Sequence, residues 1–120
     1  IKGEVDQEAD EYFGNDSRET IHGYSGEDKL HGGGGNDDIY GGTENDRLYG
    51  DEGNDELYGE AGDDDLKGGD GADTLVGGKG NDELDGGDGN DEYVYRRGDG
   101  NDTIVSYNSG SDYITLDGIR

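Results

Sequence analysis

A large apolar residue recurs every nine positions through the middle of the chain. The three residues around each such position, for example Glu56, Leu57 and Tyr58, alternate polar, apolar and polar, which is typical of a short half-buried strand. The preceding six residues are mostly glycine, asparagine and aspartate, which turn tightly and tolerate positive φ angles. The period predicts one strand and one turn per nine residues, with the apolar positions at Ile21, Leu30, Ile39, Leu48, Leu57, Leu66, Leu75, Leu84 and Tyr93.

A three-residue strand cannot bury its one leucine alone, so successive units must stack on one another and form a solenoid. Because nine residues correspond to half a coil, alternate units lie on opposite sheets across a thin interior. Residues 18 apart in the sequence then become neighbours, at the usual inter-strand spacing of about 4.8 Å. The predicted fold class is therefore all-β, a two-sheet solenoid with 18 residues per coil.

An acidic residue precedes each apolar position by two places. Stacking arranges these acids in two rows, one along each edge of the solenoid, where like charges repel and protonation at neutral pH is not expected to neutralise them. A cation must therefore lie between them. Carboxylates and turn carbonyls suit calcium, whereas zinc lacks ligands in a chain with no cysteine and two histidines. One row holds Asp28, Asp46, Asp64 and Asp82, and the other holds Asp37, Asp55, Asp73 and Asp91.

Eight consecutive nine-residue frames carry glycine first, aspartate sixth and a large apolar residue or tyrosine eighth. They begin at Gly23, Gly32, Gly41, Gly50, Gly59, Gly68, Gly77 and Gly86. This run resembles the RTX calcium-binding nonapeptide repeats of secreted bacterial toxins, proteases, lipases and adhesins. The resemblance implies a right-handed parallel β-roll in which each calcium ion bridges turns two repeats apart, bound by both sixth-position aspartates and by loop carbonyls.

The resemblance also implies a set of ligands. The sixth-position pairs give six sites, and Glu19 with Asp37 and Asp82 with Asp102 are candidates for a seventh and an eighth. Glu44 departs from the pattern because it replaces a fourth-position glycine. The implied carbonyl ligands are Gly23, Ser25, Gly26, Gly32, Gly33, Gly34, Gly35, Gly41, Gly42, Thr43, Glu44, Gly50, Asp51, Glu52, Gly53, Gly59, Glu60, Ala61, Gly62, Gly68, Gly69, Asp70, Gly71, Gly77, Gly78, Lys79, Gly80, Gly87 and Gly89.

Composition predicts a chain that cannot fold without these ions. With 27 glycines, 25% hydrophobic residues and a net charge of −24, the chain cannot bury enough apolar surface to offset its ordering entropy. Six divalent ions would halve the net charge, so binding and folding are expected to be one cooperative transition. The same negative charge argues against nucleic acid as a partner.

The period divides the chain into three parts. Residues 1–13 form an acidic flank, residues 14–94 form the roll with one degenerate repeat at 14–22, and residues 95–120 are predicted to cap its open end. Truncation after Tyr95 is expected to abolish folding. No signal peptide or transmembrane run is recognisable, and a start at Ile1 without methionine suggests a piece of a larger protein.

The function that fits best is a monomeric calcium-responsive module without enzymatic activity. The resemblance implies type I secretion of a larger toxin or adhesin, whose remaining polypeptide is the expected partner, and a secreted or bacterial cell-surface location. Alternatives are the C-terminal β-roll of a secreted metalloprotease, lipase or epimerase, or a surface- or carbohydrate-binding module that uses the face bearing Tyr40 and Tyr58. The Arg97-Gly98-Asp99 tripeptide is not expected to be adhesive, and the outward His22 and His31 are not expected to bind metal.

Overall fold

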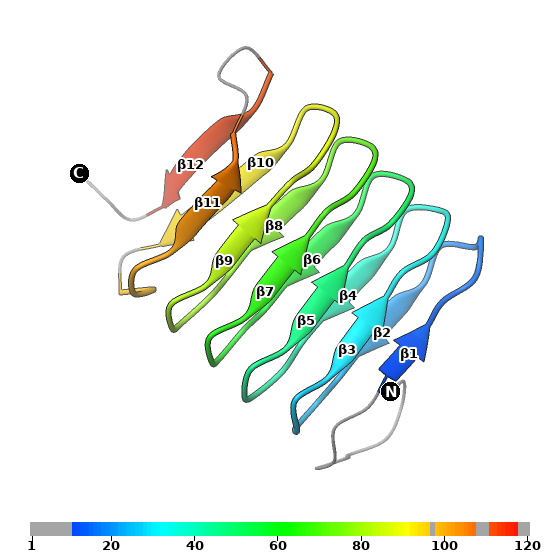
Figure 1. Ribbon diagram of the computed structural model, residues 1–120, viewed down its shortest axis with the longest axis horizontal. Helices are drawn as coiled ribbons and strands as arrows, with labels where there is room; N and C mark the ends of the chain where they lie inside the picture. Colours follow the sequence, from blue (N-terminus) through cyan, green and yellow to red (C-terminus); the bar gives the residue numbers. More distant parts are fainter. Residues whose placement is uncertain (1–10, 97, 108–110, 118–120) are drawn as a thin grey trace.

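The computed structural model describes residues 11–96, 98–107 and 111–117. These residues form twelve short strands, which wind into two facing parallel sheets (Figure 1). The odd-strand sheet contains, in spatial order, β1 (Glu11–Phe13), β3 (Lys29–His31), β5 (Arg47–Tyr49), β7 (Asp65–Lys67), β9 (Glu83–Asp85) and β11 (Thr103–Ser106). The even-strand sheet contains β2 (Thr20–His22), β4 (Asp38–Tyr40), β6 (Glu56–Tyr58), β8 (Thr74–Val76), β10 (Glu92–Arg96) and β12 (Tyr113–Asp117).

The register of the sheets follows the nine-residue period. Leu30 is the Cα partner of Leu48, which in turn pairs with Leu66, so residues 18 apart lie side by side in one sheet. Consecutive units alternate between the sheets, and the coils stack as a staircase from β1 to β12 (Figure 1). The predicted all-β, two-sheet parallel solenoid is confirmed. The described residues form no helix, and hence none that could cross a membrane.

The core lies between the two sheets and consists of one apolar side chain from each of the strands β2 to β10. All nine positions found from the period are at most 2% exposed, and Tyr12 and Ile104 pack against the two ends of the core. Each sheet therefore contributes one row of side chains to the interior, as expected for three-residue strands with one inward residue each.

Both sheets continue beyond residues 14–94. Strand β1 lies within the stretch set apart as an acidic flank, because Tyr12 stands nine residues before Ile21 and pairs with Leu30. At the other end, β11 and β12 extend the two sheets, and a register shift interrupts the pairing of β11 with β9. The 95–120 segment thus supplies the last strand of each sheet.

The outward ninth positions form two stacks of rings. On the even-strand sheet, His22, Tyr40 and Tyr58 stack with centroid distances of 4.7 and 4.8 Å. On the odd-strand sheet, the ring of His31 lies between those of Phe13 and Tyr49, at 4.4 and 4.5 Å. Each inner ring has a neighbour on both faces, so these cross-strand stacks stiffen the sheets.

Candidate metal centre

The turns between strands share one backbone conformation. Second- and fourth-position residues have positive φ angles, which glycine adopts at no steric cost, as at Gly42 with φ 96°. Among the described residues, four that are not glycine adopt the same conformation with φ of 69° or 70°: Tyr24, Glu44, Asp51 and Glu60. The turn that contains Glu44 therefore keeps the shape of the others, and the departure noted in the sequence does not displace Asp46.

Hydrogen bonds lock the sixth-position aspartates into two rows. In each row, Oδ1 of one aspartate accepts the backbone N–H of the aspartate 18 residues earlier, as in the 2.8 Å bonds from Asp28 to Asp46 and from Asp46 to Asp64. All eight predicted aspartates are at most 3% exposed. The structure thus brings together the two edge rows that stacking of the repeats predicts.

The second carboxylate oxygen in these rows lacks a hydrogen-bond partner. This oxygen, Oδ2, is buried and unpartnered in Asp37, Asp46, Asp55, Asp64, Asp73, Asp82 and Asp91. Burying a carboxylate oxygen without a partner is costly, and nearly all buried polar groups in folded proteins are satisfied. Rows of such oxygens therefore indicate that a cation belongs beside them.

First-position glycines leave the space that such a cation needs. A Cβ atom placed on Gly50 would lie 2.5 Å from Oδ2 of Asp55 and 2.6 Å from the carbonyl oxygen of Gly68 in the next coil. The same arrangement recurs at Gly59, where Oδ2 of Asp64 and the carbonyl oxygen of Gly77 converge. Only glycine leaves these pockets open, and their lining is oxygen.

This lining fits calcium. Among the described residues no three side chains of His, Cys, Asp or Glu converge on one point, so each ion would take at most two carboxylates and complete its coordination with carbonyl oxygens. A hard cation with many oxygen ligands and flexible geometry meets that description, whereas a structural zinc site would need cysteine or histidine. The first-position carbonyl of Gly86 also faces such a pocket, at Gly68, although the carbonyl set inferred from the sequence omitted it.

Burial changes the acidity of the rows. It raises the pKa of Asp64, Asp73 and Asp82 to about 8, and that of Asp46 and Asp55 to about 7, with neighbouring carboxylates adding to the effect. Without a cation, these carboxyl groups hold protons near neutral pH. The raised pKa values contradict the expectation that protonation would not neutralise these rows at neutral pH, because the depth of burial could not be seen in the sequence.

A second side-chain row runs beside the carboxylates and was missed in the sequence. Asn36 Oδ1 accepts the backbone N–H of Asn54, and Asn45 Oδ1 accepts that of Asp63, both at 2.8 Å. A fifth-position side chain therefore accepts an N–H from the next coil, whereas a sixth-position side chain accepts one from the previous coil. The recurrent Asn-Asp pairs, visible in the sequence, were the available signal for this two-way connection between coils.

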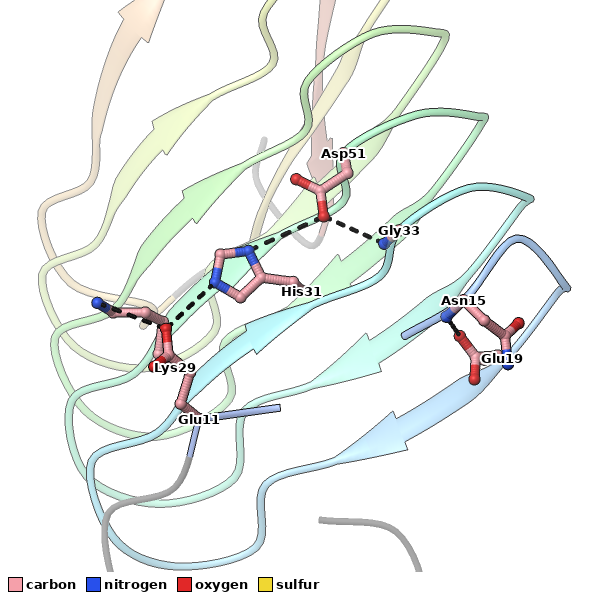
Figure 2. Close-up of polar contacts among 7 residues, drawn as sticks. All are labelled: Glu11, Asn15, Glu19, Lys29, His31, Gly33 and Asp51. Carbon is pink, nitrogen blue, oxygen red and sulfur yellow. Dashed lines mark hydrogen bonds and ion pairs between the residues drawn. The ribbon is translucent and has the colours of Figure 1, made fainter. Parts of the chain in front are cut away.

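The N-terminal candidate differs from the interior sites. The backbone N–H of Glu19 donates to Oδ1 of Asp37 at 2.8 Å, so Glu19 continues the row. Its own Oε1 accepts the N–H of Asn15 at 2.8 Å (Figure 2), and Oε2 lies 3.5 Å from the Tyr12 hydroxyl. Both oxygens of Glu19 therefore already have partners within the protein.

The C-terminal candidates continue the rows despite irregular spacing. Oδ1 of Asp102 accepts the N–H of Asp82 at 3.0 Å across 20 residues, and its Oδ2 is buried without a partner. Oδ1 of Asp112 accepts the N–H of Asp91 at 2.9 Å across 21 residues. The sequence indicated Asp102, whereas Asp112 escaped notice because its turn does not keep the 18-residue spacing.

The histidines lie outside these rows. Nε2 of His31 is 3.8 Å from Oε2 of Glu11, and its Nδ1 is 3.9 Å from Oδ2 of Asp51, on opposite sides of the ring (Figure 2). The two carboxylates therefore do not converge with His31 on one metal position. The same Asp51 oxygen accepts the N–H of Gly33 at 3.1 Å.

The repeated sequence of these turns matches a known protein family. The model of the RTX calcium-binding nonapeptide repeat, four copies long, matches residues 13–48, 40–75 and 67–104. The chain belongs to the RTX calcium-binding repeat family. Its RTX repeats form a calcium-binding β-roll, and such repeats are typical of secreted bacterial proteins. Comparison with curated protein sequences gave no match.

Proposed function

We propose that this RTX module is disordered without calcium and folds cooperatively into its β-roll when calcium binds. The observation that carries the proposal is the row of buried, unpartnered Oδ2 atoms along each edge. Without cations, folding must either bury these charges or protonate them, and both oppose the fold at neutral pH. The paired sixth-position aspartates favour about six to eight ions, each of which orders the turn that the next one requires.

Such a transition suits a segment that crosses a membrane unfolded and folds outside the cell. Extracellular calcium modules have dissociation constants on the order of 10⁻⁴ to 10⁻³ M, so the chain stays unfolded in a calcium-poor cytosol. The module then supports secretion and extracellular folding of a larger RTX toxin or adhesin, and is not itself an enzyme. The C-terminal β-roll of a secreted enzyme would use the same transition, so this alternative concerns the parent protein.

Two binding functions receive little support from the surface. Sugar rings stack on exposed aromatic faces, but the face-to-face stack of His22, Tyr40 and Tyr58 covers the ring faces that a carbohydrate would use. Of the Arg-Gly-Asp tripeptide, Arg97 lies outside the described residues, whereas Asp99 is 6% exposed and its Oδ2 accepts the N–H of Arg96 at 3.0 Å. An adhesive carboxylate would have to be exposed.

A calcium titration tests the proposal. Circular dichroism should report a coil in chelator and a β-sheet signal in millimolar calcium, with a steep transition, while calorimetry counts the bound ions. Magnesium at the same concentration is the matched control and should leave the coil unchanged, because it demands octahedral geometry and retains its waters. A compact β-sheet spectrum in excess chelator at neutral pH would overturn the proposal.

A further inference from the structure

The last regular turn of the roll is closed by a side chain. In the turns from Gly14 to Gly68, the first-position N–H donates to a backbone carbonyl of the next coil, as from Gly59 to Val76 at 2.9 Å and from Gly68 to Asp85 at 2.8 Å. At Gly86 the N–H instead donates to the hydroxyl oxygen of Tyr93 at 2.8 Å. Tyr93 is 1% exposed and is the only tyrosine among the nine core positions. Its hydroxyl therefore stands where the next coil would otherwise supply a carbonyl.

The carboxylates at this turn come from two distant parts of the chain. Asp91 is 0% exposed, and its Oδ2 is buried without a hydrogen-bond partner. Asp112 is 5% exposed, and its Oδ1 accepts the N–H of Asp91 at 2.9 Å. A Cβ on Gly86 would collide with Oδ2 of Asp91, so this pocket, like the interior ones, requires glycine.

We propose that Asp91 and Asp112 bind a further calcium ion, and that Tyr93 positions the turn for it. The site rests on the proposed calcium-dependent folding, but Asp112 lies beyond residue 104, where the family match ends, and its spacing from Asp91 is 21 residues. Carbonyl oxygens of the 86–91 turn would complete the oxygen set. The ion ties β12 to β10, so closure of the open end also depends on calcium.

Asp112→Asn tests the carboxylate. The asparagine keeps an oxygen that can accept the N–H of Asp91, but it removes one of the two negative charges at the site and so weakens calcium binding. Calorimetry should count one ion fewer per chain, with the circular dichroism signal of the interior repeats retained in saturating calcium. Asp88→Asn is the matched control, because this exposed aspartate lies in the same turn and its replacement removes the same charge. An unchanged ion count in Asp112→Asn would overturn the site.

Tyr93→Phe tests the positioning residue. Loss of its hydroxyl should weaken one ion about fivefold, as expected for one buried hydrogen bond, and should leave the remaining ions unchanged. Tyr58→Phe, on the outer face, is the control and should alter none of the ions. Equal weakening of all ions by Tyr93→Phe would mean that Tyr93 has a purely structural role.

The ion count and the folding transition answer different questions. An unchanged ion count in Asp112→Asn, with calcium-induced folding intact, would exclude the shared ion alone. Absence of calcium-induced folding would instead refute the proposed function, so the two failures are distinguishable.

Discussion

The interior turns and the C-terminal end of this RTX roll are held in place by different contacts. An interior aspartate such as Asp64 has a coil on both sides, accepting the N–H of Asp46 and donating its own N–H to Asp82. At the end, β11 and β12 arrive through irregular spacing, and the side chains of Val105 and Leu116 are 56% and 57% exposed. The same contacts recur in every coil in the middle of the roll, whereas the end is held by individual residues.

The two regions also differ in what holds them together. The interior concentrates buried charge at its edges and therefore depends on cations. The end leaves a mainly apolar cavity of about 150 Å³ that Leu84, Tyr93, Ile104, Ile114 and Leu116 line together with others. Contacts among these apolar side chains connect the last coil to the core, so the end depends more on hydrophobic burial than the edges do.

Truncation after Tyr95 should have the largest effect, because it removes the strands and carboxylates that cover the last interior coil. Leu84 would lose its cover from Ile104, and Asp82 and Asp91 would lose the carboxylates of Asp102 and Asp112. We expect no β-sheet signal by circular dichroism even in millimolar calcium. A native-like spectrum of the truncated chain would mean that the interior repeats are self-sufficient.

Acid should substitute in part for calcium, and more so in the interior than at the end. The pKa values of the interior aspartates are raised to about 7 or 8 and that of Asp91 to about 6, in each case chiefly by burial. Because these folded-state values exceed the unfolded value near 4, protonation stabilises the roll fully below about pH 4. That stabilisation is lost as the pH rises through about 6 to 8.

Circular dichroism in chelator across this pH range is the measurement. The chain should remain a coil in chelator at pH 7 to 8, and a β-sheet signal should appear as the pH is lowered below 7 toward 5. The calcium concentration at half-folding should rise over the same interval, because protons compete for the carboxylates. Urea-dependent unfolding at each pH is the control that separates folding from aggregation. A coil spectrum at every pH would show that protons cannot replace the ions.

Truncation of an apolar side chain should cost more stability in the interior than at the C-terminal end, and this difference is the next largest effect. Leu57 is 0% exposed in the middle of the core, so Leu57→Ala should lower the free energy of unfolding by about 2–5 kcal/mol. Leu116 is 57% exposed, so Leu116→Ala should cost less than about 1 kcal/mol. Urea unfolding in saturating calcium measures both, and similar losses would mean that the end is packed as tightly as the middle.

Regular features of this molecule were predictable from the sequence, and features that depend on a single contact were not. The register of Leu30, Leu48 and Leu66 follows from the period, as does the alignment of the sixth-position aspartates. The role of Asp112 could not be predicted, because backbone geometry across an irregular turn decides where it lies. The hydroxyl bond of Tyr93 was equally invisible, since periodicity assigns the side chain to the core without saying what its polar tip reaches.

The N-terminal strand illustrates a missed signal of another kind. Tyr12 stands nine residues before Ile21 and so keeps the period, but the turn between them has Asn15 and Ser17 where glycines stand in other frames. The structure tolerates both replacements and pairs β1 with β3. Apolar spacing was therefore a better guide to strand position here than turn composition.

Replacement of a strained turn residue should have the smallest effect, and it stabilises the protein. Glu60 adopts φ 70° in an interior turn, a conformation that costs a non-glycine residue about 1–2 kcal/mol. Glu60→Gly should therefore raise the free energy of unfolding in saturating calcium by about 1 kcal/mol, a value reduced by the added flexibility of the unfolded chain. Glu52→Gly is the matched control, because Glu52 is exposed in a neighbouring turn without a positive φ angle and should lose about 0.5–1 kcal/mol. The same sign for both substitutions in urea unfolding would mean that charge, and not backbone conformation, dominates these turns.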